Sequence, residues 1–373
     1  MAAISIPQTD PRAGYLEQRA EIDAAIARAL ESGAYILGRE VEAFETEFAT
    51  YIGVRHAVGL ASGTDALVLG LKTLGVGPGD GVVTVSHTAV ASVAAIELCG
   101  AIPILVDVEL QTFTMDPDDL GAVLKAPPAP VKAVVPVHLY GQPADMTAIG
   151  ALAQRHGAAV LEDACQAHGA ALDGRRVGRW GALAAFSFYP TKNLGALGDG
   201  GALVTDDPAL AERVRELRQY GWRRRYISDI AGMNSRLDEL QAALLRVKLA
   251  RLDAHNARRR AIAQAYDQGL AELDLALPAE CPGARHVWHQ YVIVVDDRER
   301  VRAALAERGV GTGIHYPQPV HLQPAYAGRL ALGPSRLAAT EALADRILSL
   351  PIYPQMDEEA VARVVEAVRE VVG

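Results

Sequence analysis

One stretch of this sequence, residues 184–205, combines a candidate nucleophile with backbone that can approach a ligand closely. It reads AAFSFYPTKNLGALGDGGALVT, so Lys192 stands between an apolar run typical of a β-strand and a loop rich in glycine. A desolvated lysine amine is a nucleophile that forms a Schiff base with an aldehyde, and glycine lets the backbone come near a ligand. Pyridoxal 5′-phosphate (PLP) is the aldehyde cofactor that enzymes hold in this way.

Few other lysines compete for this role. The chain contains five lysines, and the other four lie in ordinary predicted helices, strands or linkers: Lys72, Lys125, Lys132 and Lys248. We therefore predict that Lys192 carries PLP. The alternative is a solvated lysine in a flexible loop.

A carboxylate upstream of this lysine suits the same cofactor. The run AAVLED, residues 158–163, predicts a strand that ends at Asp163, and open α/β sheets bind ligands at strand ends. A carboxylate paired with the ring nitrogen of PLP keeps that nitrogen protonated, which makes the ring an effective electron sink. We expect Glu162 to point to the opposite face, because side chains alternate along a strand. The alternative for Asp163 is a helix cap or a structural carboxylate.

A small polar turn nearer the N-terminus predicts a binding site for a phosphate group. In residues 56–76, HAVGLASGTDALVLGLKTLGV, an apolar strand ends at Leu60 and a helix starts near Asp65. The first N–H groups of a helix have no partner within it and carry the positive end of its dipole, so they can bind a phosphate. Gly63 and Thr64 would supply these groups. The same Ser-Gly-Thr-Asp turn is equally a good helix N-cap.

Predicted strands and helices alternate around these residues, which is typical of a wound α/β domain. Strands are expected at 82–86, 102–107 and 158–163, and a long polar loop at 221–236 precedes a helix at 237–252. A chain of 373 residues should form two domains, because single cores stop growing near ~250 to 300 residues. We place a large domain at 1–250 and a small one at 251–373, with a strand at 286–295 and helices near 336–349 and 357–371.

The composition is that of an ordinary enzyme and excludes several classes of protein. A net charge of −9 argues against nonspecific nucleic-acid binding, although residues 223–225, RRR, form a cluster that could contact phosphate groups. We find no apolar run that could cross a membrane and no secretory signal, and the three cysteines fit free thiols. We therefore predict a cytoplasmic protein without membrane or nucleic-acid partners. The segment EDACQAH, residues 162–168, has no second Cys or His pair at zinc spacing, so no metal is expected.

Five segments, in this order, resemble the DegT/DnrJ/EryC1/StrS family of sugar aminotransferases and extend over nearly the whole chain. They are SGTDAL, EDACQAHGA, SFYPTKNLGALGDGGALVT, GMNSRLDELQAALL and IHYPQP. The resemblance implies the aspartate aminotransferase fold (PLP fold type I), with a mixed, mostly parallel seven-stranded sheet in the large domain and a smaller C-terminal α+β domain. It also implies a homodimer with shared active sites that moves an amino group from L-glutamate to a ketone of a nucleotide-linked sugar.

The same resemblance assigns roles around the cofactor. Lys192 would form the Schiff base, Asp163 would contact the pyridine nitrogen, and Gln166 would approach the phenolic oxygen. The residues expected at the phosphate are Gly63, Thr64, Ser187 and, from the neighbouring subunit, Asn234.

Further assignments concern the ring face and the substrate. Many family members place a tryptophan or phenylalanine over the ring two residues beyond His87, where this chain has Ala89. His87 is therefore our candidate for stacking on the cofactor, with ordinary strand-end packing as the alternative. Contacts to the sugar nucleotide are expected from Tyr220, Arg236, His315 and Tyr316.

Two segments indicate a branch of the family. SHTAVAS, residues 86–92, and QYGWRRRYISDIAGMNSRLDE, residues 219–239, are most similar to enzymes that aminate 3-keto-6-deoxyhexoses linked to dTDP. The alternative substrate is a GDP- or UDP-linked 4-keto sugar. Other functions fit less well: a sugar 3-dehydrase has histidine in place of Lys192, a PLP-binding regulator without turnover needs a nucleic-acid-binding module, and a Rossmann dehydrogenase needs a G-x-G-x-x-G turn.

Overall fold

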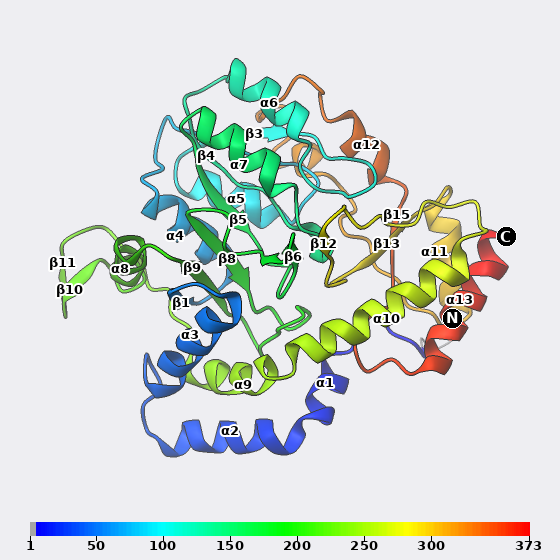
Figure 1. Cartoon of the computed structure of the whole chain (residues 1–373), viewed down its shortest axis with the longest axis horizontal. Coiled ribbons are helices and arrows are strands. Elements are labelled where there is room, and N and C mark those ends of the chain that lie inside the picture. The colour runs from blue at the N-terminus through cyan, green and yellow to red at the C-terminus, as the bar shows by residue number, and fades with distance from the viewer. Residues whose placement is uncertain (1–4) are drawn as a thin grey trace.

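The computed structural model describes residues 5–373, and a central sheet of eight strands organises its larger part (Figure 1). The strand order is β1-β9-β8-β5-β4-β2-β3-β14. The strands are β1 (His56–Leu60), β2 (Gly81–Val85), β3 (Ile102–Val106), β4 (Val131–Val134), β5 (Ala159–Asp163), β8 (Leu183–Ser187), β9 (Gly201–Thr205) and β14 (Ala331–Leu332). All neighbouring pairs are parallel except those of β9 with β1 and with β8. The predicted α/β fold with a mixed, mostly parallel sheet is confirmed.

The sheet has one strand more than the predicted seven. The additional strand, β14, comes from the C-terminal part of the chain, where Ala331 and Leu332 pair in parallel with β3. A strand of two residues carries no repeating hydrophobic pattern, so only its tertiary pairing reveals it.

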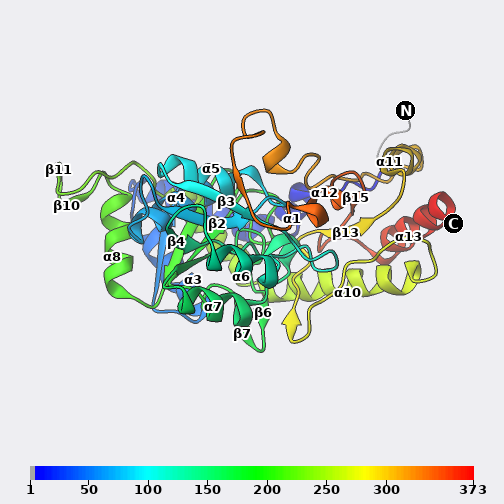
Figure 2. The same ribbon diagram turned by 90° about the horizontal axis from the view of Figure 1, so that it is seen from above.

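Helices cover both faces of the sheet, as Figure 2 shows from above. One face packs against α4 (Gly63–Thr73), α5 (Val90–Leu98) and α8 (Pro208–Leu217). The other packs against α3 (Arg39–Ile52), α6 (Pro117–Lys125), α7 (Met146–Arg155) and α9 (Glu239–Leu249). Along β2, Val82 and Val83 enter the apolar clusters on opposite faces, because side chains alternate. Strands buried on both faces need the near-continuous apolar runs that predicted them.

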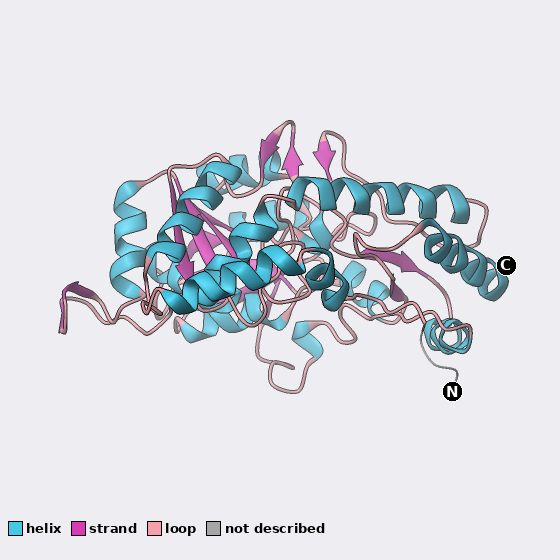
Figure 3. Ribbon diagram, turned by 90° about the horizontal axis from the view of Figure 1, so that it is seen from below, coloured by secondary structure: helices cyan, strands magenta, loops and turns pink. Residues whose placement is uncertain are grey.

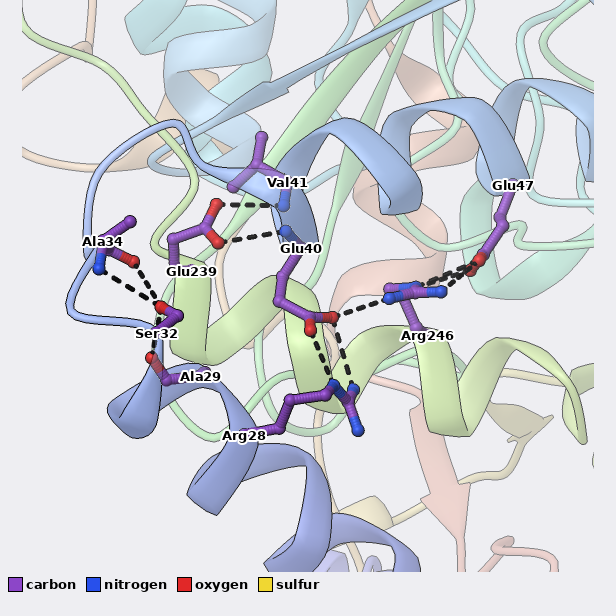
Figure 4. A network of polar contacts seen from close by, with 9 residues as sticks. All are labelled: Arg28, Ala29, Ser32, Ala34, Glu40, Val41, Glu47, Glu239 and Arg246. Atoms are coloured by element: carbon purple, nitrogen blue, oxygen red, sulfur yellow. Dashed lines mark hydrogen bonds and ion pairs between the residues drawn. The ribbon is translucent and has the colours of Figure 1, made fainter.

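Charged side chains join α9 to α3 and to α2 (Arg19–Glu31), which follows α1 (Pro11–Glu17) (Figure 4). The Glu239 carboxylate accepts hydrogen bonds from the backbone N–H groups that begin α3, those of Gly38, Glu40 and Val41. Glu40 in turn pairs with Arg28 and with Arg246, each at 2.7 Å. A carboxylate at a helix N-terminus complements the helix dipole, so Glu239 fixes α3 on α9.

A smaller C-terminal unit lies at the far end of the long helix α10 (Leu252–Leu270), to the right in Figure 1. Its antiparallel strands β13 (Tyr291–Val294) and β15 (Ile347–Leu350) share one apolar cluster with α11 (Arg298–Glu307) and α13 (Glu358–Val372). Figure 3 shows from below that helices lie beside strands at this C-terminal end of the molecule. The predicted strand 286–295 is shorter because Trp288 has a left-handed φ of 48°. The predicted helix 336–349 is wrong beyond Ala344, since 347–350 form β15.

Two segments cross the predicted boundary between residues 250 and 251. Near the N-terminus, Ile6 bridges to Val310 and packs in the apolar cluster of the small unit. In the C-terminal part, Asp107 holds α12 (Ala338–Ala344) against the large sheet by accepting from Thr340 N and Oγ1 at 2.9 and 2.8 Å. The limits 1–250 and 251–373 stay predictions. Each unit also contains a segment from the other side of the predicted boundary.

Short elements complete the fold. A three-stranded sheet contains β12 (Ala284–Arg285), β6 (Ala171–Leu172) and β7 (Arg175–Arg176), and 3₁₀ turns occur at Leu139–Gly141 and Val320–Leu322. The predicted polar loop 221–236 contains a hairpin, β10 (Trp222–Arg224) and β11 (Ile227–Ser228), which projects from the body at the left of Figures 1 and 2. Within residues 5–373, no helix combines the length and the apolar character needed to cross a bilayer.

Candidate active site

A cavity opens where the parallel strands β2, β5 and β8 end and helix α4 begins. Six of the residues predicted for cofactor binding line it: Gly63, Thr64, Asp163, Gln166, Ser187 and Lys192. The carboxyl ends of parallel strands meet at one edge of a sheet, which is where open α/β folds bind ligands. The fold thus brings three separate segments of the chain to one cavity.

Lys192 sits in a tight turn after β8. Its backbone N–H donates to the Tyr189 carbonyl at 2.8 Å, and a Cβ at Gly195 would lie 2.4 Å from the Pro190 carbonyl oxygen, so only glycine closes this turn. Helix α9 supports the turn, because Lys248 Nζ donates to the Gly195 carbonyl at 2.6 Å. Burial lowers the pKa of the Lys192 amine, an effect that Cys165 and Asp163 partly oppose. A lowered pKa leaves more of the amine neutral and nucleophilic.

Asp163 and Glu162 show how one strand separates two carboxylates. Asp163, the last residue of β5, faces the cavity and accepts from Ser92 Oγ at 2.8 Å and from the Cys165 N–H at 3.2 Å. Glu162 points away, as the alternation predicted, and accepts from three backbone N–H groups, those of Gly178, Trp180 and Gly181. Glu162 is therefore structural, and Asp163 is the carboxylate available to a ligand.

The N-terminus of α4 forms one wall of the cavity. Ser62 is its N-cap and accepts from the Asp65 N–H at 3.0 Å, so the capping alternative for this turn is correct as well. A Cβ on Gly63 would lie 2.6 Å from Ser187 Cβ and 3.0 Å from Cys165 Sγ. Only glycine therefore lets β8 approach the helix N-terminus so closely. Helix N–H groups with the nearby hydroxyls of Thr64 and Ser187 make an anion site.

Gln166 connects the cavity to Tyr316, a residue from the C-terminal part of the chain. Its Oε1 accepts from the Tyr140 N–H at 2.9 Å, so its amide nitrogen faces the other way and donates to Tyr316 Oη at 3.0 Å. Burial raises the pKa of Tyr316 to about 12, which keeps this hydroxyl protonated at neutral pH. Two residues predicted from distant motifs, Gln166 and Tyr316, are thus in direct contact.

Sequence reasoning missed Tyr140, which organises this contact. Tyr140 is buried in a turn with a φ of 58°, and its hydroxyl donates to the His315 carbonyl and lies 2.9 Å from His87 Nε2. Tyrosine followed by glycine is a weak turn signal, and no local pattern indicates what the hydroxyl will reach. Ser92, Cys165 and Thr88 were missed for the same reason.

His315 lies beside this network. Its Nδ1 is 2.8 Å from Ser349 Oγ, and burial, aided by the charge of Lys192, lowers its pKa to about 4. His315 is therefore neutral near pH 7. It is placed to offer a hydrogen bond rather than a charge.

His87 lies outside the residues that line the cavity, whereas Ala89 is among them. The His87 ring is buried between Phe113 and Tyr140, with centroid distances of 6.0 Å to each, and burial lowers its pKa to about 4. This position matches the packing alternative more closely than the stacking role. The stacking role stays a prediction.

His315 and Tyr316 do not line this cavity either, and their predicted contacts to the sugar nucleotide stay predictions. Three further predicted residues lie outside the lining of the cavity in their own chain: Tyr220, Arg236 and Asn234. They belong to the segment around the projecting hairpin, where the backbone N–H of Tyr220 donates to the Met233 carbonyl at 3.0 Å. Tyr220 and Asn234 are exposed and Arg236 is half-buried. Their contacts to substrate or to a partner subunit's cofactor stay predictions.

The residues in the cavity fit each functional group of PLP. The Lys192 amine suits the aldehyde, the Asp163 carboxylate suits the ring nitrogen, and the Gln166 amide suits the phenolic oxygen. The N-terminus of α4 at Gly63, where a Cβ would collide with Ser187, suits the phosphate.

Comparisons with known proteins agree with this geometry. Residues 17–369 match the DegT/DnrJ/EryC1/StrS aminotransferase family. The dTDP-3-amino-3,4,6-trideoxy-alpha-D-glucose transaminase of Streptomyces venezuelae is 51% identical over 366 residues, which cover 98% of this chain and 96% of the relative. The crystal structure of S. venezuelae DesV in complex with a ketimine intermediate has a TM-score of 0.94 at 51% identity and covers 98% of each chain. The structure of NtdA from Bacillus subtilis with bound cofactor PMP has a TM-score of 0.87 at 34% identity, over 95% of this chain and 82% of that one. This chain therefore belongs to the DegT/DnrJ/EryC1/StrS aminotransferase family.

Proposed function

We propose that this aminotransferase uses PLP to move an amino group from L-glutamate to the 3-keto group of a dTDP-linked 6-deoxyhexose. The observation that carries the proposal is the cavity itself, which joins a desolvated lysine, a carboxylate and a helix N-terminus fitted to a phosphate. The 3-position and the dTDP group are supported by the name of the S. venezuelae relative, whose product carries a 3-amino group. The segments SHTAVAS and QYGWRRRYISDIAGMNSRLDE favour the same branch.

Each residue of the cavity has a task in this reaction. Bound PLP supplies an electrophilic carbon and an electron sink. Lys192 would hold the aldehyde carbon of PLP through its amine and, once a substrate amine has taken that place, would be the base that moves the proton of the substrate carbon. Asp163 holds the proton on the ring nitrogen. Water would release 2-oxoglutarate and leave the amino group on the cofactor, and the keto sugar would then accept that group, with loss of water, through the same steps in reverse.

A homodimer with shared active sites is part of the proposal. Asn234 is exposed and does not line the cavity of its own chain, which fits a role at the phosphate of the partner subunit's cofactor. Four large apolar side chains are also exposed: Tyr35 at 53%, Ile36 at 52%, Tyr189 at 52% and Leu197 at 44%. We assign them to the proposed dimer interface, because exposed apolar surface is buried when subunits associate. We place the dimer in the cytoplasm.

A substrate panel tests the proposal. The PLP-loaded protein is first converted with L-glutamate, and dTDP-, UDP- and GDP-linked 3-keto and 4-keto sugars are then offered, with amination followed by mass. We expect the dTDP-linked 3-keto sugar to be aminated fastest. Fastest turnover of a GDP- or UDP-linked 4-keto sugar would contradict the proposed substrate. Formation of 2-oxoglutarate with no sugar aminated would contradict the sugar aminotransferase itself.

A further inference from the structure

A short chain of hydroxyl groups ends on the carboxylate of Asp163. Ser92, on α5, donates from Oγ to Asp163 Oδ2 at 2.8 Å, and Thr88 Oγ1 lies 3.0 Å from Ser92 Oγ. The other carboxylate oxygen, Oδ1, accepts from the Cys165 N–H at 3.2 Å. All three side chains of the chain Thr88, Ser92 and Asp163 are buried, at 3%, 1% and 4% exposure. Both oxygens of the carboxylate are therefore held by donors of the protein.

Chemistry determines the direction of these hydrogen bonds. An ionised carboxylate only accepts, so the single hydroxyl proton of Ser92 is committed to Asp163. The contact between the two hydroxyls must then use the proton of Thr88. Thr88 lines the cavity. Because its hydroxyl proton is donated to Ser92, the Thr88 hydroxyl can only accept a hydrogen bond from a ligand in the cavity.

The position of Ser92 argues for more than local packing. Ser92 is the third residue of α5, and a serine in the first turn of a helix commonly bonds a backbone group close to it in the sequence. Ser92 instead directs its proton to a carboxylate 71 residues away, at the end of β5. A charge-assisted hydrogen bond of this kind stabilises the negative charge and restricts rotation of the carboxylate.

We infer that Ser92, oriented by Thr88, is a positioning residue that aims the ionised Asp163 carboxylate at the ring nitrogen of the cofactor and so keeps that nitrogen protonated. The inference rests on the proposed role of Asp163. It assigns a function to the SHTAVAS segment that does not depend on His87.

The experiment compares matched variants that remove or keep each hydroxyl. Ser92→Ala removes the donor and Ser92→Thr keeps it, while Thr88→Val removes the second hydroxyl and Thr88→Ser keeps it. Each variant is loaded with PLP labelled with ¹⁵N in the ring, and the ¹⁵N chemical shift reports the protonation of that nitrogen. Stopped-flow absorbance measures the half-reaction with L-glutamate, and Asp163→Asn serves as the reference for a lost carboxylate.

We expect Ser92→Ala to move the ¹⁵N shift toward that of neutral pyridine and to slow the half-reaction about tenfold, with KM for glutamate nearly unchanged. Ser92→Thr should restore both, and Thr88→Val should give a smaller change in the same direction. If Asp163→Asn moves the shift but Ser92→Ala and Thr88→Val do not, the inference is wrong and the role of Asp163 stands. If Asp163→Asn leaves the shift unchanged, the role of Asp163 falls and the inference with it. If Ser92→Ala does not fold, the ¹⁵N shift of Thr88→Val decides between these outcomes.

Discussion

Two regions of the molecule differ in how their side chains are held in place. One is the cofactor wall, the part of the cavity that would face PLP, and the other is the segment around the projecting hairpin. The cofactor wall consists of buried and half-buried groups at the ends of β5 and β8 and at the start of α4, and hydrogen bonds within one chain hold Ser62, Asp163 and Gln166 in place. The hairpin segment, residues 218–238, carries exposed aromatic and apolar side chains, with Tyr226 at 73% and Ile227 at 46% exposure. Its predicted functional residues, Tyr220, Asn234 and Arg236, do not line the cavity of their own chain.

This difference separates the chemistry from the recognition of partner and substrate. Groups that must be aimed within a fraction of an ångström need rigid elements and supporting hydrogen bonds. Groups that meet a second subunit or a sugar nucleotide can lie on an exposed segment, because the partner or the ligand completes their contacts. Substitutions in the cofactor wall should therefore strongly reduce activity or PLP binding. Substitutions in the hairpin segment should reduce activity only where the site of the second subunit depends on the substituted residue.

Removing the amine of the cofactor wall should have the largest effect. Lys192→Ala deletes both the covalent anchor and the group that moves the proton, so we expect the half-reaction with glutamate to slow by at least about a thousandfold. The visible absorption band of lysine-bound PLP should also disappear. Lys248→Ala, which removes a lysine that supports the turn, is the matched control and should retain the band. A persistent band in Lys192→Ala would refute the lysine assignment.

Mixing two defective subunits tests the hairpin segment. Asn234→Asp places a negative charge where the partner subunit's cofactor phosphate is proposed to lie, so it should weaken PLP binding in the neighbouring site. In a hybrid of Asn234→Asp with Lys192→Ala, one site carries both defects and the other carries none. Random mixing should therefore restore about a quarter of the wild-type activity. If the mixture stays as inactive as its parents, Asn234 acts within its own chain or the protein is not a dimer with shared sites.

A single methyl group tests the tightness of the cofactor wall. Gly63→Ala would place a Cβ 2.6 Å from Ser187 Cβ, so either β8 or the start of α4 must move. We expect PLP to bind about ten- to a hundredfold more weakly, equivalent to the ~1–3 kcal/mol typical of overpacking. Equilibrium titration of the apoprotein with PLP measures this. Gly77→Ala, in a turn with open space around the site of a Cβ, is the control. Unchanged PLP affinity in Gly63→Ala would show that the wall adjusts freely.

Lowering the pH should destabilise the folded protein through His168, a histidine buried near this wall. Burial, aided by the charge of Lys192, lowers the pKa of His168 to about 3, so below pH 6.5 the unfolded chain takes up a proton that the folded chain excludes. This contribution to stability is complete above pH 6.5 and is lost as the pH falls toward 3. Between pH 7.5 and 5, the His168 contribution should lower the free energy of unfolding of the wild type by about 2 kcal/mol. The His168→Asn variant should lack this part of the loss. Denaturant unfolding at both pH values measures the difference, and parallel losses in the two proteins would contradict it.

Local patterns determined much of this protein from sequence alone. Apolar runs and their spacing predicted the wound α/β domain, and Lys192, Asp163 and Gly63 stood out because a nucleophile, a strand-end carboxylate and a glycine at a helix start are each visible within a few residues. Gln166 and Ser187 were added by resemblance of the surrounding motifs. All five line one cavity.

Only the tertiary structure decided the contacts between distant segments. It joined β14 to the sheet, turned His87 toward Tyr140 and away from the cavity lining, and directed the Ser92 proton to Asp163. Periodicity reports which face of an element is apolar. It does not report which side chain from another element will meet that face, because packing of the whole chain selects the partner among many of similar energy.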